Sequence, residues 1–280
     1  MSLFNPYIKS AEQGHAEAQL KLVEAIKQNT EAFLDVPKGV ITPEFCLAAV
    51  QANCWVLVYM PEELKTLEMC ITAVQESSWL LGFVPEAYKT PELCRTAVQH
   101  AGETLMDVPK LFKTPELCLT AVRNNGKALR YVPKAFRIPD LCRIAVRNNG
   151  IALRYVPETL RTPDLCRIAV RKSGWPLKFM PMECITPEMC LMAVQKTGIA
   201  LEYVPEELKT LELCLTAVQK NGRAFKFVPE GFKTPEFCRA AIQSNYNVLR
   251  YVPEELKDQA QKLSIAAAPG GKRHGQKMEH

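Results

Sequence analysis

Long apolar runs are missing from this chain of 280 residues. None approaches the roughly 18 residues that a membrane-spanning helix needs, so the sequence predicts no transmembrane segment. The first residues also lack a basic stretch followed by an apolar one, and we therefore expect no signal peptide. These two absences predict a cytoplasmic protein.

Histidine is scarce, and the residue patterns of catalytic and metal sites are absent. The four histidines stand at positions 15, 100, 274 and 280, and no Ser/His/Asp, Cys/His or phosphate-loop arrangement accompanies them. No CxxC pair is present to hold zinc. We therefore expect a protein that is not an enzyme and that binds no cofactor and no metal.

Cysteine, by contrast, occurs eleven times, and nine of the eleven recur at a constant interval of 24 residues. The nine are Cys46, Cys70, Cys94, Cys118, Cys142, Cys166, Cys190, Cys214 and Cys238. Equivalent residues of stacked helices lie about 8–10 Å apart, which is too far for a disulfide. The nine are expected to be small buried hydrophobes, whereas Cys54 and Cys184 lie outside the series and are predicted to be exposed thiols.

A fixed period of this length predicts a solenoid, in which each repeat buries its apolar face only against its neighbours. Prolines recur with the same interval from Pro37 to Pro253. We expect an all-α superhelical solenoid in three parts. Residues 1–41 form an N-terminal cap with a degenerate repeat, 42–257 hold nine repeats, and 258–280 form a C-terminal cap and a disordered tail.

Each repeat predicts one longer and one shorter helix, as in Thr114–Arg137. Threonine at position 1 is a good N-cap, proline at position 2 suits the first turn, and an acid at position 3 favours the helix dipole. Positions 4, 5, 8 and 9 carry the apolar stripe. Glycine at position 13 is expected to end the helix in a left-handed conformation, and Leu129 and Val132 of the shorter helix should point inward.

The motif TPELCxxAVxxNGxALxxVPxxLK, nearly complete in residues 114–137 and 138–161, resembles the repeats called domain of unknown function 4116. The resemblance covers residues 42–257 and implies an α-solenoid without an assigned role. Such repeats occur in intracellular bacteria and their protozoan hosts, including proteins that resemble secreted effectors, which suggests a bacterial protein that could act inside a host cell. The stretch AEQGHAEAQLKL before the repeats resembles the start of a Sel1-type helical repeat; alternatively, it is an amphipathic cap helix.

Positions that vary between repeats are the candidates for binding. All three tryptophans, Trp55, Trp79 and Trp175, stand at position 14. Such an aromatic set is typical of a groove that binds a partner. Alternatively, each tryptophan folds back over its own helix–helix seam.

Positive charge gathers in residues 114–185, where thirteen Lys and Arg face five Asp and Glu, although the whole chain has a formal net charge of only +5. Position 10 is arginine only here and glutamine in the other six full repeats, and position 17 is also basic here. The residues concerned are Arg123, Arg147 and Arg171 at position 10, and Arg130, Arg154 and Lys178 at position 17. These rows predict basic stripes, unless they are only a solvated face whose stems cover neighbouring helices.

The leading hypothesis is a monomeric interaction scaffold that binds an acidic partner protein through these variable positions. The alternative is a nucleic-acid-binding solenoid that uses the same basic rows. It is the less favoured, because the net charge is modest and the sequence shows no aromatic residues between the arginines.

Overall fold

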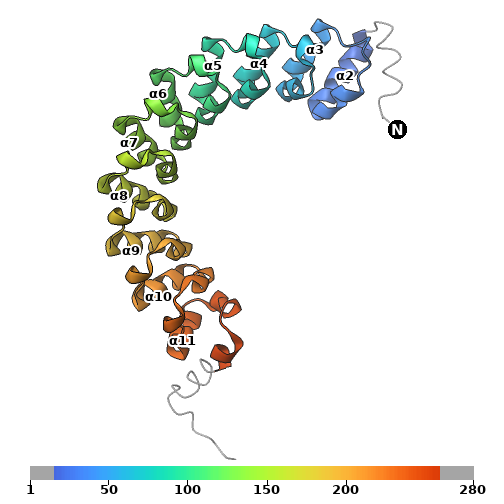
Figure 1. Cartoon of the computed structure of the whole chain (residues 1–280). Coiled ribbons are helices and arrows are strands. Elements are labelled where there is room, and N and C mark those ends of the chain that lie inside the picture. Colours follow the sequence, from blue (N-terminus) through green and yellow to red (C-terminus); the bar gives the residue numbers. More distant parts are fainter. Residues whose placement is uncertain (1–15, 259–280) are drawn as a thin grey trace, which may run out of the picture. The chain divides into compact units, whose positions relative to one another are not determined.

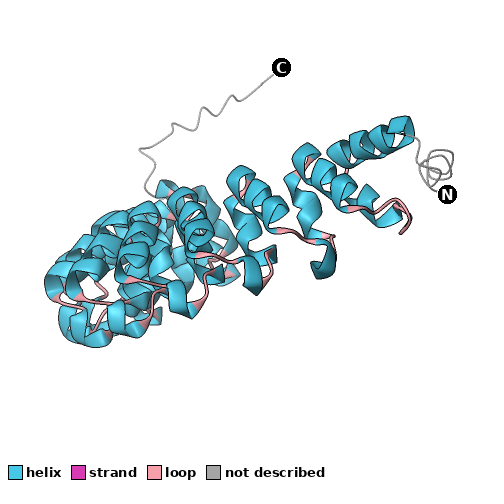
Figure 2. Ribbon diagram, turned by 90° about the horizontal axis from the view of Figure 1, so that it is seen from above, coloured by secondary structure: helices cyan, strands magenta, loops and turns pink. Residues whose placement is uncertain are grey.

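The computed structural model describes residues 16–258 (Figure 1). The regular structure of this part consists of helices without strands (Figure 2). None of these helices combines the length and the hydrophobicity that a bilayer span requires. The first residues of the Sel1-like stretch and the tail from residue 259 onward lie outside the described residues.

The backbone forms two compact units, Met1–Tyr155 and Val156–His280, which are described separately. Each repeat begins with an α-helix of ten residues. Unit 1 holds α2 (Ala16–Gln28), α3 (Pro43–Ala52), α4 (Leu67–Glu76), α5 (Pro91–His100), α6 (Pro115–Asn124) and α7 (Pro139–Asn148). Unit 2 holds α8 (Pro163–Lys172), α9 (Pro187–Lys196), α10 (Leu211–Lys220) and α11 (Pro235–Ser244).

Two 3₁₀ helices follow each α-helix from α3 to α10, where the sequence predicted one short helix, and a single one follows α2 and α11. In unit 1 they are η1 (Thr30–Asp35), η2 (Cys54–Val58), η3 (Glu62–Leu64), η4 (Ser78–Phe83), η5 (Glu86–Tyr88), η6 (Gly102–Asp107), η7 (Lys110–Phe112), η8 (Gly126–Tyr131), η9 (Lys134–Phe136) and η10 (Gly150–Tyr155). In unit 2 they are η11 (Glu158–Leu160), η12 (Trp175–Phe179), η13 (Met182–Cys184), η14 (Gly198–Tyr203), η15 (Glu206–Leu208), η16 (Gly222–Phe227), η17 (Glu230–Phe232) and η18 (Tyr246–Arg250). A helical segment over 254–258 ends the described part.

Threonine caps the α-helix in every full repeat except the fifth, and proline begins the helix in all but the second and eighth, as the sequence predicts. In α6 the Leu117 N–H donates to Thr114 Oγ1 at 3.2 Å, and Pro115 occupies the first helical turn. Proline at position 20 does not simply end the second helix; it precedes the three-residue 3₁₀ helix, as Pro133 does before η9. This tight helix leads the chain back to the next threonine within a few residues.

Successive α-helices pack against each other within each unit, and so do successive longer 3₁₀ helices. The stripe at positions 4, 5, 8 and 9 is buried throughout the nine repeats, apart from a half-buried Ile242 in the last, and the nine periodic cysteines are fully inaccessible. Leu129 and Val132 also point into the core, as predicted. The chain is therefore an all-α solenoid whose interior runs along the line of repeats.

The helix before the first full repeat closes the end of unit 1. Helix α2 packs against α3, and its Leu22 and Ile26 are buried. Leu22 stands where the later repeats have cysteine. The 3₁₀ helix η1 follows α2, so the degenerate repeat keeps the α-then-3₁₀ order of the full copies.

Glycine at position 13 does not end the helix in a left-handed conformation, and that prediction is wrong. Gly126 has an ordinary backbone and begins η8, while Asn125 before it takes an extended conformation. A Cβ atom on Gly126 would lie 2.3 Å from the carbonyl oxygen of Ala145 in the next repeat. The glycine is therefore required because the next repeat approaches closely.

The prediction that Cys54 and Cys184 are exposed thiols is wrong for Cys184. Cys184 is buried, and its thiol donates to the carbonyl oxygen of Arg161 at 3.6 Å, so it is not an exposed thiol. It ends η13, at the place where the other full repeats carry leucine, phenylalanine or tyrosine facing the next layer. Cys54 is half-buried.

Candidate protein-interaction surface

In six of the nine full repeats a side chain two residues earlier accepts a hydrogen bond from the backbone N–H of position 14, whereas η4, η6 and η14 lack this cap. In η2 the Trp55 N–H donates to Asn53 Oδ1 at 3.1 Å, and in η8 the Lys127 N–H donates to Asn125 Oδ1 at 3.0 Å. The polar residue at position 12 thus fixes the backbone of the variable residue. The side chain at position 14 can then change between repeats without altering the turn.

Positions 14, 17 and 18 of successive repeats form one surface in unit 1, which we call the 3₁₀ face. The helices η2, η4, η6, η8 and η10 that carry it lie side by side in this order. The face comprises Trp55, Val58, Tyr59, Trp79, Gly82, Phe83, Glu103, Met106, Asp107, Lys127, Arg130, Tyr131, Ile151, Arg154 and Tyr155.

The first three repeats give the 3₁₀ face an apolar half. Trp55 and Trp79 keep 45% and 47% of their surface exposed, and Phe83 and Met106 are also exposed. About half of the surface of each tryptophan therefore remains accessible to a partner. Four exposed large apolar side chains on neighbouring helices are the kind of patch that marks an interaction site.

The fourth and fifth repeats give the same face a basic half. Lys127, Arg130 and Arg154 are exposed there. The guanidinium of Arg130 lies 5.6 Å from the centre of the Tyr131 ring, and that of Arg154 lies 5.9 Å from the Tyr155 ring. An aromatic ring therefore lies beside each of these arginines, contrary to the sequence-based expectation. The sequence offered a signal, since the residue after each of these arginines is tyrosine.

A small hollow opens within the basic half. It has a volume of about 280 Å³ and is lined by Glu103, Lys127, Arg130, Tyr131 and Tyr155. Glu103 is engaged there, because Asn125 Nδ2 donates to its Oε1 at 2.7 Å. The hollow therefore holds two cations, one carboxylate and two aromatic rings, so its lining has a net positive charge that favours an anionic group such as a carboxylate or phosphate.

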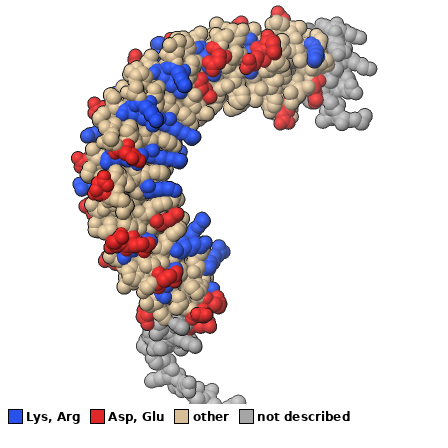
Figure 3. Space-filling model, viewed as in Figure 1, with Lys and Arg blue, Asp and Glu red and all other residues tan. Residues whose placement is uncertain are grey.

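The position 10 arginines occupy the α-helices. Arg123 and Arg147 are exposed near the C-terminal ends of α6 and α7, which pack together in unit 1. Cations there also interact favourably with the helix dipole. In Figure 3 the basic side chains gather over the part of unit 1 that holds α6 and α7. The structure brings this pair together.

The third member of each predicted row lies in unit 2. Arg171 is exposed on α8, and Trp175 and Lys178 are exposed on η12. The Trp175 ring lies 6.2 Å from that of Tyr203 in the next repeat, and Lys178 Nζ lies 5.1 Å from the centre of the same Tyr203 ring. These residues contact the neighbouring repeat, and Trp175 is not folded over its own seam.

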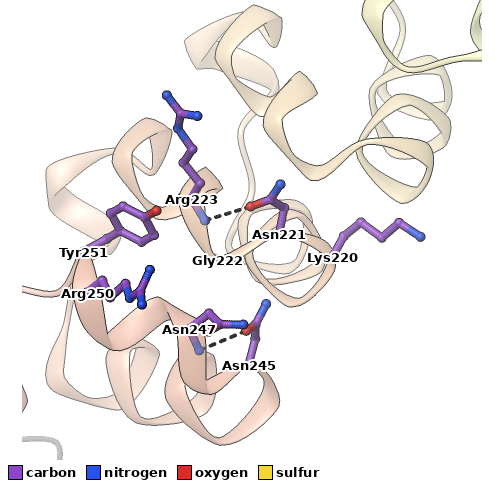
Figure 4. A pocket seen from close by; sticks show the side chains of 8 residues that line it. All are labelled: Lys220, Asn221, Gly222, Arg223, Asn245, Asn247, Arg250 and Tyr251. Carbon is purple, nitrogen blue, oxygen red and sulfur yellow. Dashed lines mark hydrogen bonds between the residues drawn. The ribbon is translucent and has the colours of Figure 1, made fainter.

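A further basic hollow in unit 2 was missed by the sequence reasoning (Figure 4). Its volume is about 410 Å³. It is lined by Lys220, Asn221, Gly222, Arg223, Asn245, Asn247, Arg250 and Tyr251. Arg223 and Arg250 occupy positions 14 and 17, the positions of the basic residues in the fourth repeat. A comparison of these two positions between repeats could therefore have predicted this hollow.

Not every cation of the basic centre is available to a partner. Arg137 donates to three backbone carbonyl groups: Nε to Val132, Nη1 to Tyr155 and Nη2 to Arg130, at 3.0–3.1 Å. Arg161 bonds Val156 and Phe179 in the same way.

Position 24, just before each threonine, carries this cation in all but one of the full repeats. Lysine replaces arginine in most of them, and Lys65, Lys113 and Lys209 each donate to the carbonyl oxygen eighteen residues later. The regular Lys or Arg before each threonine could have revealed this structural ladder. Among the described residues, no group of three or more His, Cys, Asp or Glu is placed to hold a metal ion.

Comparison with known protein families agrees with this repeat structure. The family model described as domain of unknown function (DUF4116) matches residues 42–89, 90–137, 139–185, 163–209, 186–233 and 210–257. The chain belongs to this family. Each match of the DUF4116 model spans two of the 24-residue repeats seen here. No curated protein matches the chain.

Proposed function

We propose that the chain is a non-enzymatic interaction scaffold that binds an acidic partner protein on the 3₁₀ face. The observation that carries the proposal is the continuity of this face in unit 1, where exposed Trp55 and Trp79 precede exposed Lys127, Arg130 and Arg154 on adjacent helices. Aromatic residues and arginines are the side chains that dominate binding energy at protein interfaces.

The arrangement favours a segment with an apolar anchor and acidic residues. The anchor would lie over the tryptophans, and the carboxylates would reach the hollow beside Arg130. Charges on the rim of such a surface act chiefly through the association rate, while the aromatic half holds the bound segment. A monomeric scaffold is sufficient, because both halves belong to one unit.

A pulldown from a lysate of the native host tests the proposal. The double variant Arg130→Glu/Arg154→Glu should lose the partner, and Trp79→Gln should weaken its retention. The control is Arg143→Glu, an exposed arginine on α7 that lies outside the face. Equal retention by all the variants would remove the 3₁₀ face from the binding site.

Nucleic acid is the second candidate, favoured by the stacking of Arg130 and Arg154 on tyrosine rings. Arginine and aromatic side chains side by side are the elements of a single-strand binding groove. Titration with a labelled single-stranded RNA at several salt concentrations separates the two candidates. A steep linear loss of log affinity with log salt supports nucleic acid, whereas a nuclease-resistant pulldown supports the protein partner.

We also propose that the protein works in a reducing compartment. Nine thiols packed in the core suit the cytoplasm, and the family resemblance extends this to the cytoplasm of a host cell reached by a secreted effector. Fractionation of the producing cells and of infected host cells, with antibody detection, tests the location.

A further inference from the structure

A second hollow of unit 1 lies on the α-helical side, at the seam between the fourth and fifth repeats. It joins the start of α6, the helix η9 and the start of α7, and has a volume of about 410 Å³. Its apolar lining includes Leu119, Phe136, Ile138 and Ile144. None of these residues belongs to the 3₁₀ face, so the hollow is separate from the surface described above.

Ile138 departs from the repeat pattern at this seam. Position 1 is threonine in the other eight full repeats. Ile138 cannot cap α7, and no side-chain cap replaces it, whereas Thr114 caps α6. Loss of such a cap destabilises a helix. Ile138 also leaves 56% of its surface exposed, so neither helix formation nor core packing explains the isoleucine.

The apolar character of the hollow depends on a combination found at no other seam. Leu119 and Ile144 occupy positions 6 and 7, which are exposed or half-buried columns of the α-helices. The preceding seam has Arg95 and Thr120 at these positions, next to a threonine at position 1. The fifth repeat is the only full copy in which positions 1 and 7 are both isoleucine.

The apolar surface continues beyond this hollow. An adjoining depression shares Pro115 and Phe136 with it and includes Leu111. Leu111 keeps 85% of its surface exposed. The two depressions together present aliphatic and aromatic side chains from three consecutive repeats, which is more than one isolated exposed residue.

The hollow itself carries acidic residues, whereas Lys110 and Lys113 line the adjoining depression. Glu116 and Asp140 line the hollow, and no lysine or arginine does. Neither carboxylate takes part in a salt bridge within the described residues. An occupant must therefore supply apolar groups and benefits from a positive charge.

We propose that this hollow docks a short segment of a partner protein that carries a bulky apolar side chain next to lysine or arginine. The apolar side chain lies against Ile138 and Ile144, and the cation pairs with Glu116 and Asp140. Such a segment differs in charge from the acidic partner of the 3₁₀ face. The two sites can therefore hold different segments, and each can fail without the other.

Fluorescence anisotropy with synthetic peptides tests the proposal. Three labelled nonapeptides are used: one with a central Leu-Leu-Phe between lysines, one with the same centre between glutamates, and one with three serines between lysines. To remove binding of acidic segments to the 3₁₀ face, the measurement uses the full chain with Arg130→Gln/Arg154→Gln, which should bind the first peptide at least tenfold more tightly than the other two. Glu116→Gln/Asp140→Asn should reduce the preference for lysine over glutamate.

The sixth repeat supplies a matched control, because α7 and α8 share the residues PDLCRIAVR. Ile138→Thr/Ile144→Thr should weaken binding of the first peptide at least tenfold, and Ile168→Thr should leave it unchanged. Ile138→Thr restores the cap of the sister repeats, so this change should not lower the melting temperature. Thermal denaturation of each variant shows that it is folded.

Three results would overturn the proposal. One is equal affinity for all three peptides, and another is equal weakening by Ile144→Thr and Ile168→Thr. The third is a wild-type dimer in analytical ultracentrifugation that Ile138→Thr dissociates, since the hollow would then hold a second copy of the chain.

Discussion

The seam between the fourth and fifth repeats and the 3₁₀ face of the same repeats both carry arginine, in very different surroundings. At the seam, Arg137 is fixed by hydrogen bonds to three backbone carbonyl groups. On the face, Arg130 is exposed and lies over the ring of Tyr131. The first arginine joins two layers, whereas the second remains accessible to a partner.

This difference shows that a count of basic residues overestimates the number of cations that a partner can reach. Thirteen cations occur in residues 114–185, but Arg137 and Arg161 are occupied by backbone groups. The exposed cations, among them those at positions 10, 14 and 17, are the ones that a partner can reach. Four predictions test the division between interior and face, and they are given in order of decreasing effect on stability.

Alkaline pH should destabilise the interior most strongly. Burial raises the pKa of Cys118 and Cys142 to about 11, from an ordinary value of 9.0. As the pH rises above 9, the unfolded chain loses thiol protons that the folded chain retains, so the free energy of unfolding falls. Between pH 9 and about 11, each such thiol lowers the free energy of unfolding by about 1.4 kcal/mol per pH unit. Urea denaturation at pH 8–10.5 measures the slope.

The double variant Cys118→Ala/Cys142→Ala is the control for this slope. Removing two thiols should make the pH dependence shallower by about 2.7 kcal/mol per pH unit, while tyrosines and lysines that titrate in the same range stay unchanged. The buried thiols should also resist alkylation in the folded protein at pH 8. A slope equal to that of the wild type would show that the thiols are not responsible.

Removing the seam arginine should be the most damaging single substitution. Arg137→Met keeps much of the stem but leaves three carbonyl acceptors without their donor. We expect a loss of about 2–4 kcal/mol in the free energy of unfolding, since hydrogen bonds to charged groups contribute about 1.5–3 kcal/mol each and are not additive. Arg137→Lys should lose less, because lysine makes the equivalent bond from Lys113. Thermal denaturation of both variants gives the comparison.

Asp107, at position 18 of the third repeat, is a site where a substitution should raise the free energy of unfolding. Position 18 is aromatic in the other full repeats, and burial raises the pKa of Asp107 despite the nearby Lys89 and Lys113. A raised pKa means that its contribution to stability is present below the ordinary carboxyl range and is lost as the pH rises through the folded pKa. Asp107→Tyr should therefore stabilise the protein at pH 7 by about 0.5–2 kcal/mol.

The pH dependence distinguishes this cause from simple packing. Asp107→Asn removes the titration without adding a ring. Its stability advantage over the wild type at pH 7 should shrink as the pH falls toward 3.8, the ordinary value of the group. An advantage that does not change with pH would contradict the electrostatic explanation.

The position 10 arginines should matter least to stability. The triple variant Arg123→Gln/Arg147→Gln/Arg171→Gln places in three repeats the residue that the other six full repeats already have. We expect the free energy of unfolding to stay within about 0.5 kcal/mol of the wild-type value. Binding of an acidic partner should weaken through slower association, which surface plasmon resonance at low and high salt measures. Unchanged association would leave the tryptophans of the 3₁₀ face as the better candidates.

The sequence by itself determined the repeat length, the start of each α-helix and its buried stripe. These features depend on local chemistry that recurs in most copies: threonine caps the helix in eight of the nine full repeats, proline fits its first turn in seven, and positions 4, 5, 8 and 9 share one helical face. The inaccessibility of Cys118 and its eight counterparts follows from the same periodicity. The rows of variable residues could also be named from the sequence, because alignment of the repeats is unambiguous.

Only the tertiary structure decided which residues of neighbouring repeats contact each other. The contact of Gly126 with Ala145, the bonds from Arg137 to Tyr155 and the burial of Cys184 each join residues about twenty positions apart in the chain. Such contacts depend on the spacing and rotation of neighbouring layers, which local propensity does not specify. For the same reason, only the packing of η2 to η10 places the tryptophans and the position 17 arginines on one face of unit 1.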